Sequence, residues 1–103
     1  MMRFSEEQHE GLARLCQRYR VRRLALFGSA TGREFDRSRS DLDFAVEFEP
    51  LNPQQHTENY FGLLEDLERL FQRAIDLVEY GPIRNPYFRQ SLEETQVLLY
   101  DAA

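Results

Sequence analysis

The sequence lacks lysine entirely, and all 13 of its basic residues are arginine. A P-loop needs a Gly-Lys-Ser/Thr run, so a Walker-type NTPase is excluded. Enzymes that work through a lysine Schiff base or a lysyl-adenylate are excluded for the same reason. The Gly-x-Ser-x-Gly elbow of serine hydrolases is also missing. These absences remove several common covalent and nucleotide-binding chemistries.

Cysteine is scarce as well, because Cys16 is the only one. An internal disulfide and a cysteine-based zinc site are therefore both excluded. No apolar run approaches the roughly 20 residues that span a bilayer, and the first residues lack the apolar core of a secretory signal. We expect a single domain over residues 1–103 that works in the reducing cytoplasm, away from membranes.

Positive charge is in deficit, with a formal net charge of −5. Residues 1–40 hold 9 arginines and 5 acids, whereas residues 41–103 hold 4 arginines and 13 acids. A protein that grips duplex nucleic acid through its phosphates is usually basic. We therefore expect no direct binding of nucleic acid.

Hydrophobic periodicity predicts alternating helices and strands. A capping box of Ser5 and Gln8 opens a helix over 6–19, a second helix ends near residue 71, and a third begins at 85–86. Strands are expected at 22–27, 41–48, 74–80 and 97–100. We expect a loop over 49–56, with Asn52-Pro53 as an alternative helix start. This order predicts an α/β (α+β) fold in which helices pack on a small mixed sheet of about four strands.

Aspartates gather on two of these strands. Asp41 and Asp43 share one face of strand 41–48, since side chains at i and i+2 point the same way, and the large apolar residues between and after them face the core. Asp76, between two apolar residues, is expected on the aspartate side. Such like charges are unfavourable unless a cation neutralises them, and Mg²⁺ prefers carboxylate oxygens. Three carboxylates predict a two-metal site for transfer at phosphorus, although an exposed polar strand face is the simpler interpretation.

A phosphate site is predicted just upstream. Gly28-Ser29 ends a strand, where glycine lets the backbone approach a ligand and serine supplies a hydroxyl. The loop that follows contains Arg33, Arg37 and Arg39, which suit a triphosphate but are also ordinary solvated charges. Ser40 either bonds a phosphate or caps the next strand.

Other conspicuous side chains are given plainer interpretations. His9 and His56 lack metal-ligand spacing and lie in expected surface segments, so no role is assigned to them. Cys16 adjoins the apolar stripe of the first helix and is expected to be packed. Four aromatic residues are expected to be core or subunit-contact residues, with an adenine platform as the alternative: Tyr60, Phe61, Tyr87 and Phe88.

Taken in order, these segments resemble the signature of the DNA polymerase β-like nucleotidyltransferase superfamily. The resemblance is carried by Leu26-Phe27-Gly28-Ser29-Ala30 followed by Asp41-Leu42-Asp43, and is closest to the minimal nucleotidyltransferase (MNT) domains. It extends to Ile75-Asp76-Leu77-Val78 and to Arg84-Asn85-Pro86-Tyr87-Phe88. It covers nearly the whole chain and implies a polymerase β-like nucleotidyltransferase fold in one minimal domain.

The resemblance also implies an activity. Family members transfer a nucleoside monophosphate from an NTP, usually ATP, to a hydroxyl and release pyrophosphate. By that resemblance Asp41 and Asp43 would ligate Mg²⁺, and Asp76 would complete the metal site and help to deprotonate the acceptor. Gly28 and Ser29 would hold the β- and γ-phosphates. Further nucleotide contacts are expected from Arg33, Arg39 and Ser40.

A partner is implied in the same way. MNT domains are typically encoded beside a HEPN-domain protein, a toxic RNase that the MNT antitoxin adenylylates on a tyrosine. A chain of this size leaves little room for an acceptor-binding lobe, so a HEPN toxin or a second copy of this chain would present the hydroxyl. Two alternatives stay open: a non-catalytic antitoxin that neutralises the toxin by binding, and a stand-alone enzyme acting on a small molecule.

Two departures from the family pattern affect the phosphate contacts. Eleven residues, 30–40, separate Gly-Ser from Asp-x-Asp, where family members often have ten. Thr31-Gly32-Arg33 stands where many relatives carry Ala-Arg-Gly. The arginine that would reach phosphate therefore stays open among Arg33, Arg37 and Arg39.

Overall fold

The computed structural model describes residues 4–28, 42–81 and 86–102. Its helices are α1 (Glu6–Arg18), α2 (Pro53–Phe71) and α3 (Pro86–Thr95), and its strands are β1 (Val21–Phe27), β2 (Leu42–Phe48), β3 (Ile75–Glu79) and β4 (Val97–Asp101). The strands form one sheet in the order β3-β2-β1-β4. β1 is antiparallel to both of its neighbours, whereas β2 and β3 are parallel. The predicted mixed sheet with helices packed on it is confirmed.

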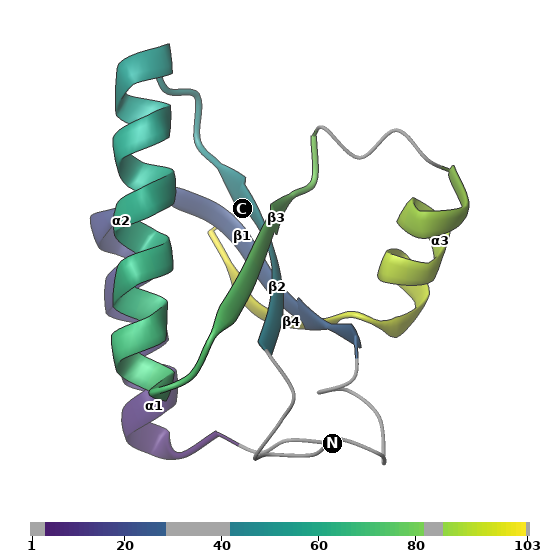
Figure 1. The fold of residues 1–103 in the computed structure, drawn as a ribbon, viewed down its shortest axis with the longest axis horizontal. Coiled ribbons are helices and arrows are strands. Elements are labelled where there is room, and N and C mark those ends of the chain that lie inside the picture. Colours follow the sequence, from purple (N-terminus) through teal and green to yellow (C-terminus); the bar gives the residue numbers. More distant parts are fainter. Residues whose placement is uncertain (1–3, 29–41, 82–85, 103) are drawn as a thin grey trace.

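The main core lies between the sheet and two of the helices. Figure 1 shows α1 and α2 together on one face of the sheet and α3 on the opposite side. Leu42, Phe44 and Val46 of β2 alternate into this core and are fully buried, as their spacing predicted. Cys16 of α1 is fully buried among them, so the prediction that it is packed is also confirmed. Each large side chain buried in this way contributes about 1.5–3 kcal/mol.

Local signals set the helix starts. Ser5 and Gln8 form the predicted capping box, and Asn52 and Gln55 form a second one that spans Pro53 at the start of α2. Each box satisfies backbone N–H groups that the first helical turn leaves unpaired. The expected loop over 49–56 is therefore wrong beyond residue 52, and the alternative start at Asn52-Pro53 is correct.

Helices α1 and α2 approach closely where Gly62 faces Tyr19. A Cβ on Gly62 would lie 2.6 Å from Cε1 of Tyr19, so only glycine lets the phenol ring pack there. The Tyr19 hydroxyl donates a hydrogen bond to Asp66, further along α2. The backbone carbonyl of Tyr19 accepts one from the Asn59 side chain at 2.9 Å. Burial, reinforced by the hydrogen bond to Asp66, raises the pKa of Tyr19. This contact joins the end of α1 to the middle of α2.

The opposite face of the sheet carries a second, smaller core. Ala25 and Phe27 of β1 cluster there with Ala45 of β2 and Tyr80, all of them buried. Ala45, two residues after Asp43 on β2, lies on the same face as that aspartate. That face is nevertheless largely apolar, and its polar residues lie at the ends of the strands.

The exposed aromatics exclude the core half of one expectation, and the subunit-contact half stays a prediction. Phe61 is 59% exposed and Tyr87 is 82% exposed, so neither is a core residue. Tyr60 packs against the main core, as expected. The side chain of Phe88 lies outside the described residues. In the described part of the chain, no helix is both long and apolar enough to cross a bilayer.

Candidate active site

Asp43 and Asp76 are brought together by the pairing of β2 with β3. They are direct partners in the parallel register, so their side chains project from the same face of adjacent strands. Asp43 is partly buried and Asp76 is exposed. Their neighbours Leu42 and Leu77 are buried on the α1/α2 face, which leaves both carboxylates on the other face. The sequence predicted that Asp76 lies on the same sheet face as the aspartates of strand 41–48. The structure confirms this relationship between Asp76 and Asp43.

Gly28 closes this site from the β1 side. Phe27 is the antiparallel partner of Asp43, and the chain then turns through Gly28 with φ of 73°. A Cβ on Gly28 would lie 2.4 Å from Oδ2 of Asp43. Residue 28 must therefore be glycine for two reasons, its left-handed backbone and the carboxylate beside it.

Most of the remaining predicted site residues lie outside the described residues. This holds for Asp41, Ser29 and the whole segment between them, including Arg33, Arg37, Arg39 and Ser40. Within residues 4–28, 42–81 and 86–102, no group of three potential metal-ligating side chains is found. Two of the three predicted metal ligands, Asp43 and Asp76, lie within the described residues.

The donor set of this pair suits a hard divalent cation. Both side chains offer carboxylate oxygens, which Mg²⁺ prefers, and they come from adjacent strands of one sheet. Gly28 itself places no side chain between its backbone and the Asp43 carboxylate. The described residues therefore fit a Mg²⁺ ion, whose remaining ligands would be Asp41 and substrate phosphates.

The far end of the same sheet face holds a contact that sequence reasoning missed. The guanidinium of Arg23 lies 3.9 Å above the ring of Tyr80 and 3.6 Å from Glu47. The Tyr80 hydroxyl donates to Gln96, in the connection between α3 and β4. Burial raises the pKa of Tyr80, and the nearby Arg23 partly offsets that rise. The available signal was alternation, since Arg23 shares its strand face with Phe27.

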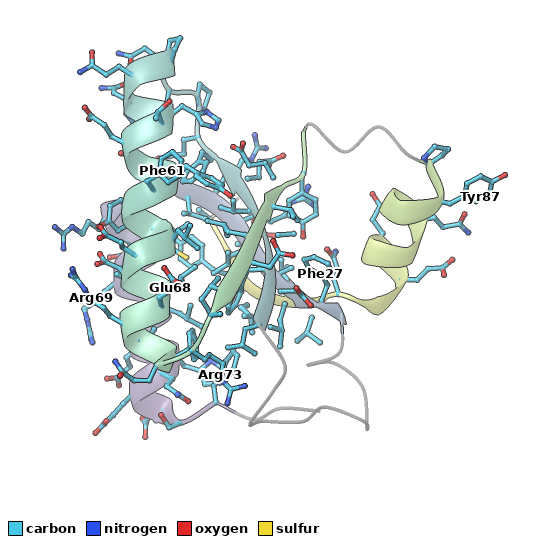
Figure 2. All side chains as sticks on the ribbon, in the orientation of Figure 1. Phe27, Phe61, Glu68, Arg69, Arg73 and Tyr87 are labelled. Carbon is cyan, nitrogen blue, oxygen red and sulfur yellow. The ribbon has the colours of Figure 1, made fainter. Side chains whose placement is uncertain are left out.

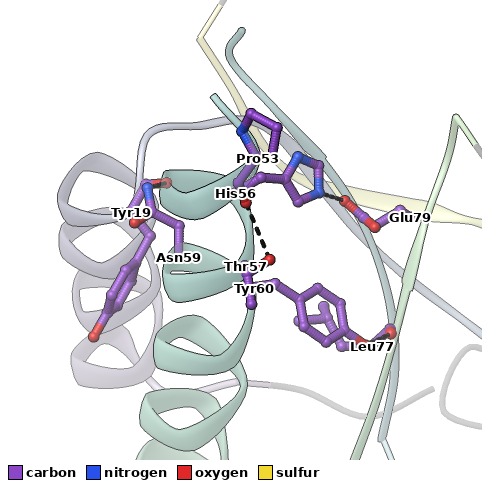
Figure 3. A network of polar contacts seen from close by, with 8 residues as sticks. All are labelled: Tyr19, Pro53, His56, Thr57, Asn59, Tyr60, Leu77 and Glu79. Atoms are coloured by element: carbon purple, nitrogen blue, oxygen red, sulfur yellow. Dashed lines mark hydrogen bonds and ion pairs between the residues drawn. The ribbon is translucent and has the colours of Figure 1, made fainter. Parts of the chain in front are cut away.

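Helix α2 holds β3, and with it Asp76, from the other side. Figure 3 shows Tyr60 pointing at the backbone of Leu77, to which its hydroxyl donates at 2.5 Å. Burial raises the pKa of Tyr60, helped by the negative charges of Glu79 and Asp76. In the same view His56 pairs with Glu79 at the end of β3. The spacing of the histidines assigned no role to His56, and the structure shows that this side chain joins the start of α2 to β3.

Comparison with known proteins agrees with this geometry. Residues 10–99 match the nucleotidyltransferase domain family. A relative from Methanocaldococcus jannaschii, described as "Putative protein adenylyltransferase MJ1379", is 40% identical over 81 residues that cover 78% of each chain. The chain belongs to the nucleotidyltransferase domain family, and it is a nucleotidyltransferase.

Solved structures share the fold. A structure described as a "putative minimal nucleotidyltransferase" is 27% identical, covers 88% of each chain and has a TM-score of 0.65. A toxin-antitoxin structure with AMP-PNP is 20% identical, with a TM-score of 0.64 over 91% of this chain and 73% of the other. The predicted resemblance to the minimal nucleotidyltransferases is confirmed, and the second structure bears on the fold alone.

Proposed function

We propose that this chain is a Mg²⁺-dependent protein adenylyltransferase that acts as an antitoxin. It transfers AMP from ATP to the hydroxyl group of a tyrosine on a partner toxin of the HEPN class. The observation that carries the proposal is the register of Asp43 with Asp76, with Gly28 packed against Asp43. The relative described as a protein adenylyltransferase supports the choice of AMP and of a protein acceptor.

Each residue has a stated task in this proposal. Asp41, Asp43 and Asp76 hold Mg²⁺, and Gly28 and Ser29 hold the β- and γ-phosphates together with Arg33, Arg39 and Ser40. When bound, the metal supplies positive charge that stabilises the developing negative charge on the phosphates. Asp76 takes up the proton of the acceptor hydroxyl, directly or through water.

The reaction balances without a covalent enzyme intermediate. The acceptor oxygen forms a bond to the α-phosphorus, and the bond from that phosphorus to the oxygen bridging to the β-phosphorus breaks. Pyrophosphate leaves with the bonding pair and the bridging oxygen. Since nothing else is consumed, ATP and the acceptor are the only substrates required.

The first experiment is calorimetric titration of ATP into the purified protein, with Mg²⁺ and then with EDTA. Wild type is expected to bind ATP only with Mg²⁺, and Asp43→Asn is expected to lose that binding. The matched control is Asp101→Asn, which removes the same charge from an exposed residue at the other end of the sheet. Binding unaffected by EDTA or by Asp43→Asn would remove the proposed metal site.

The second experiment follows transfer to a HEPN-domain partner with ATP labelled on the α-phosphate. Asp43→Asn is expected to lower the rate more than about a hundredfold, the scale on which loss of a transition-state contact acts. Neutralisation of the toxin that persists in Asp43→Asn cells would instead identify an antitoxin that works by binding. Label appearing on a small hydroxyl compound without a partner would identify a stand-alone enzyme.

A further inference from the structure

A groove runs along the seam of α1 and α2 on their outer side. It is about 370 Å³ in volume and is lined by Gly11, Arg14, Leu15 and Arg18 of α1 and by Asp66, Arg69 and Leu70 of α2. Both helices cover the sheet face opposite Asp43 and Asp76 (Figure 1). The groove is therefore separate from the candidate active site, and its residues have no part in the proposed reaction.

The rim of the groove is positively charged in a chain whose net charge is −5. Three arginines face one aspartate, which leaves an excess of two positive charges. Arg18 and Arg69 lie 3.9 and 3.6 Å from the same carboxylate of Asp66, which also accepts from Tyr19. The Asp66 carboxylate thus forms ion pairs with two guanidinium groups and accepts a hydrogen bond from a phenol. Arg14, exposed on the rim, adds a third guanidinium.

The rim arginines are held by exposed contacts: Arg18 and Arg69 share Asp66, and the Arg18 guanidinium also lies 5.4 Å from the centre of the Tyr19 ring. The side chains of Arg18 and Arg69 are 71% and 75% exposed, and Figure 2 shows Arg69 pointing from α2 away from the sheet. Exposed ion pairs of this kind contribute little to stability, so an incoming carboxylate can compete for the guanidinium groups. Arginine is also the charged residue enriched at protein interfaces.

The floor of the groove is apolar. Leu15 and Leu70 are partly buried, with the rest of their surface open to the groove. Gly11, which also lines the groove, packs directly against Leu70, since a Cβ on Gly11 would lie 2.9 Å from Cδ1 of Leu70. A ligand that fits must offer an apolar side chain to the floor and negative charge to the rim.

We propose that this groove docks an acidic, leucine-containing segment of another protein. Its carboxylates pair with Arg14, Arg18 and Arg69, and its apolar side chain rests on Leu15 and Leu70. Nucleic acid fits less well, because a phosphate backbone offers no apolar side chain to Leu15 and Leu70 on the floor. The proposal goes beyond nucleotidyl transfer and holds whether or not the active site is used.

The test is NMR titration of the ¹⁵N-labelled full chain, read at the arginine Nε–Hε and backbone amide signals. The probe is a helical peptide with glutamate and leucine on one face, and its control has lysine in place of each glutamate. The acidic peptide is expected to shift the signals of Arg14, Arg18, Arg69 and Gly11 saturably, and more weakly at high salt. The lysine peptide is expected to leave them unmoved.

Variants locate the binding. Arg14→Gln is expected to lower the affinity for the acidic peptide about threefold. The double variant Arg14→Gln/Arg69→Gln is expected to lower it about tenfold. Gln17→Glu changes the charge of α1 as much as Arg14→Gln does, but lies outside the groove lining, and is expected to leave the affinity within about twofold. All variants should bind ATP like wild type, which separates this test from that of the proposed function.

Several outcomes would overturn the proposal. One is the absence of groove shifts at millimolar acidic peptide, and another is equal binding of both peptides. A third is unchanged affinity in the double arginine variant. A duplex DNA oligonucleotide that shifts the groove signals when the acidic peptide does not would replace the proposal with a nucleic-acid surface.

Discussion

Gly28 and Asp43 are so close that no side chain fits between them. Strand pairing places Phe27 opposite Asp43, and the left-handed turn at Gly28 then brings the backbone against the carboxylate, where a Cβ would lie 2.4 Å from Oδ2. This geometry explains why glycine stands before Ser29 in the family signature of this chain. It shapes the position of the one strand β2 aspartate that the structure describes.

Substituting Gly28 by alanine is expected to abolish Mg²⁺-dependent ATP binding, because Asp43 must move. The left-handed backbone adds a cost of about 1–2 kcal/mol in the free energy of unfolding. Calorimetry with ATP measures the first effect and urea denaturation the second.

Gly81→Ala is the matched control, since a Cβ on Gly81 meets no atom within 4 Å. It should leave both ATP binding and stability near wild type. If Gly28→Ala binds ATP as wild type does, the contact with Asp43 has no part in the nucleotide site.

Asp76→Asn is expected to lower the transfer rate more than about a hundredfold while stability changes by less than about 0.5 kcal/mol. The side chain is exposed at the sheet edge, so the neutral amide fits the fold but is a poor metal ligand and cannot accept the acceptor proton. Single-turnover transfer and thermal denaturation measure the two quantities. An unchanged rate would leave β2 alone as the source of the metal ligands.

Tyr60→Phe is expected to lower the free energy of unfolding by about 1 kcal/mol, because it removes the hydrogen bond to the Leu77 carbonyl and little else. The control is Tyr100→Phe, because Tyr100 is another partly buried tyrosine that packs on the core. This change is expected to lower the free energy of unfolding by less than about 0.5 kcal/mol. Urea denaturation compares the two. Equal losses would show that the Tyr60 hydroxyl does not help to hold β3.

Stability is expected to fall as the pH rises above 9, and Cys16 supplies the first part of the fall. Burial raises the pKa of its thiol from 9.0 to about 12. Above pH 9 the unfolded thiol loses its proton while the folded one keeps it, so deprotonation favours the unfolded state. The slope from this one group is at most about 1.4 kcal/mol per pH unit.

The pH prediction is tested by urea denaturation between pH 7 and 10 on wild type and Cys16→Ala. The raised pKa values of Tyr19, Tyr60 and Tyr80 also lower stability as the pH approaches their ordinary value of 10.0. Wild type and Cys16→Ala share these tyrosines, so the difference between the two profiles reports Cys16. The variant is expected to be less stable at pH 7 but to show a flatter profile above pH 9. Parallel profiles would mean that the thiol does not cause the alkaline loss.

The sequence could predict what is locally encoded. The alternation of Leu42, Phe44 and Val46 identified β2 and its buried face, and the capping box at Ser5 identified the start of α1. The same local rules left α2 with two possible starts. The capping box between Asn52 and Gln55 decides between them, and the Gln55 signal was available in the sequence.

What the sequence could not predict depends on pairing between distant segments. The register of Asp43 with Asp76 is set by the sheet order, which helices and strands in sequence do not fix. The His56–Glu79 pair depends on where α2 begins and on where β3 ends. Arg23 lies on the same strand face as Phe27, but its contact with Tyr80 exists only once β1 and the end of β3 share one sheet.

The parallel pairing of β2 and β3 has a consequence for biosynthesis. Parallel neighbours need a crossover, and here α2 is that crossover, so the two carboxylates meet only after the ribosome has released β3. A chain cut short after α2 keeps Asp43 but has no Asp76 to face it. Nucleotide that binds only the folded form stabilises that form by mass action. Under the proposed function, ATP is therefore expected to protect finished chains from protease, and chains that lack β3 are expected to gain no such protection.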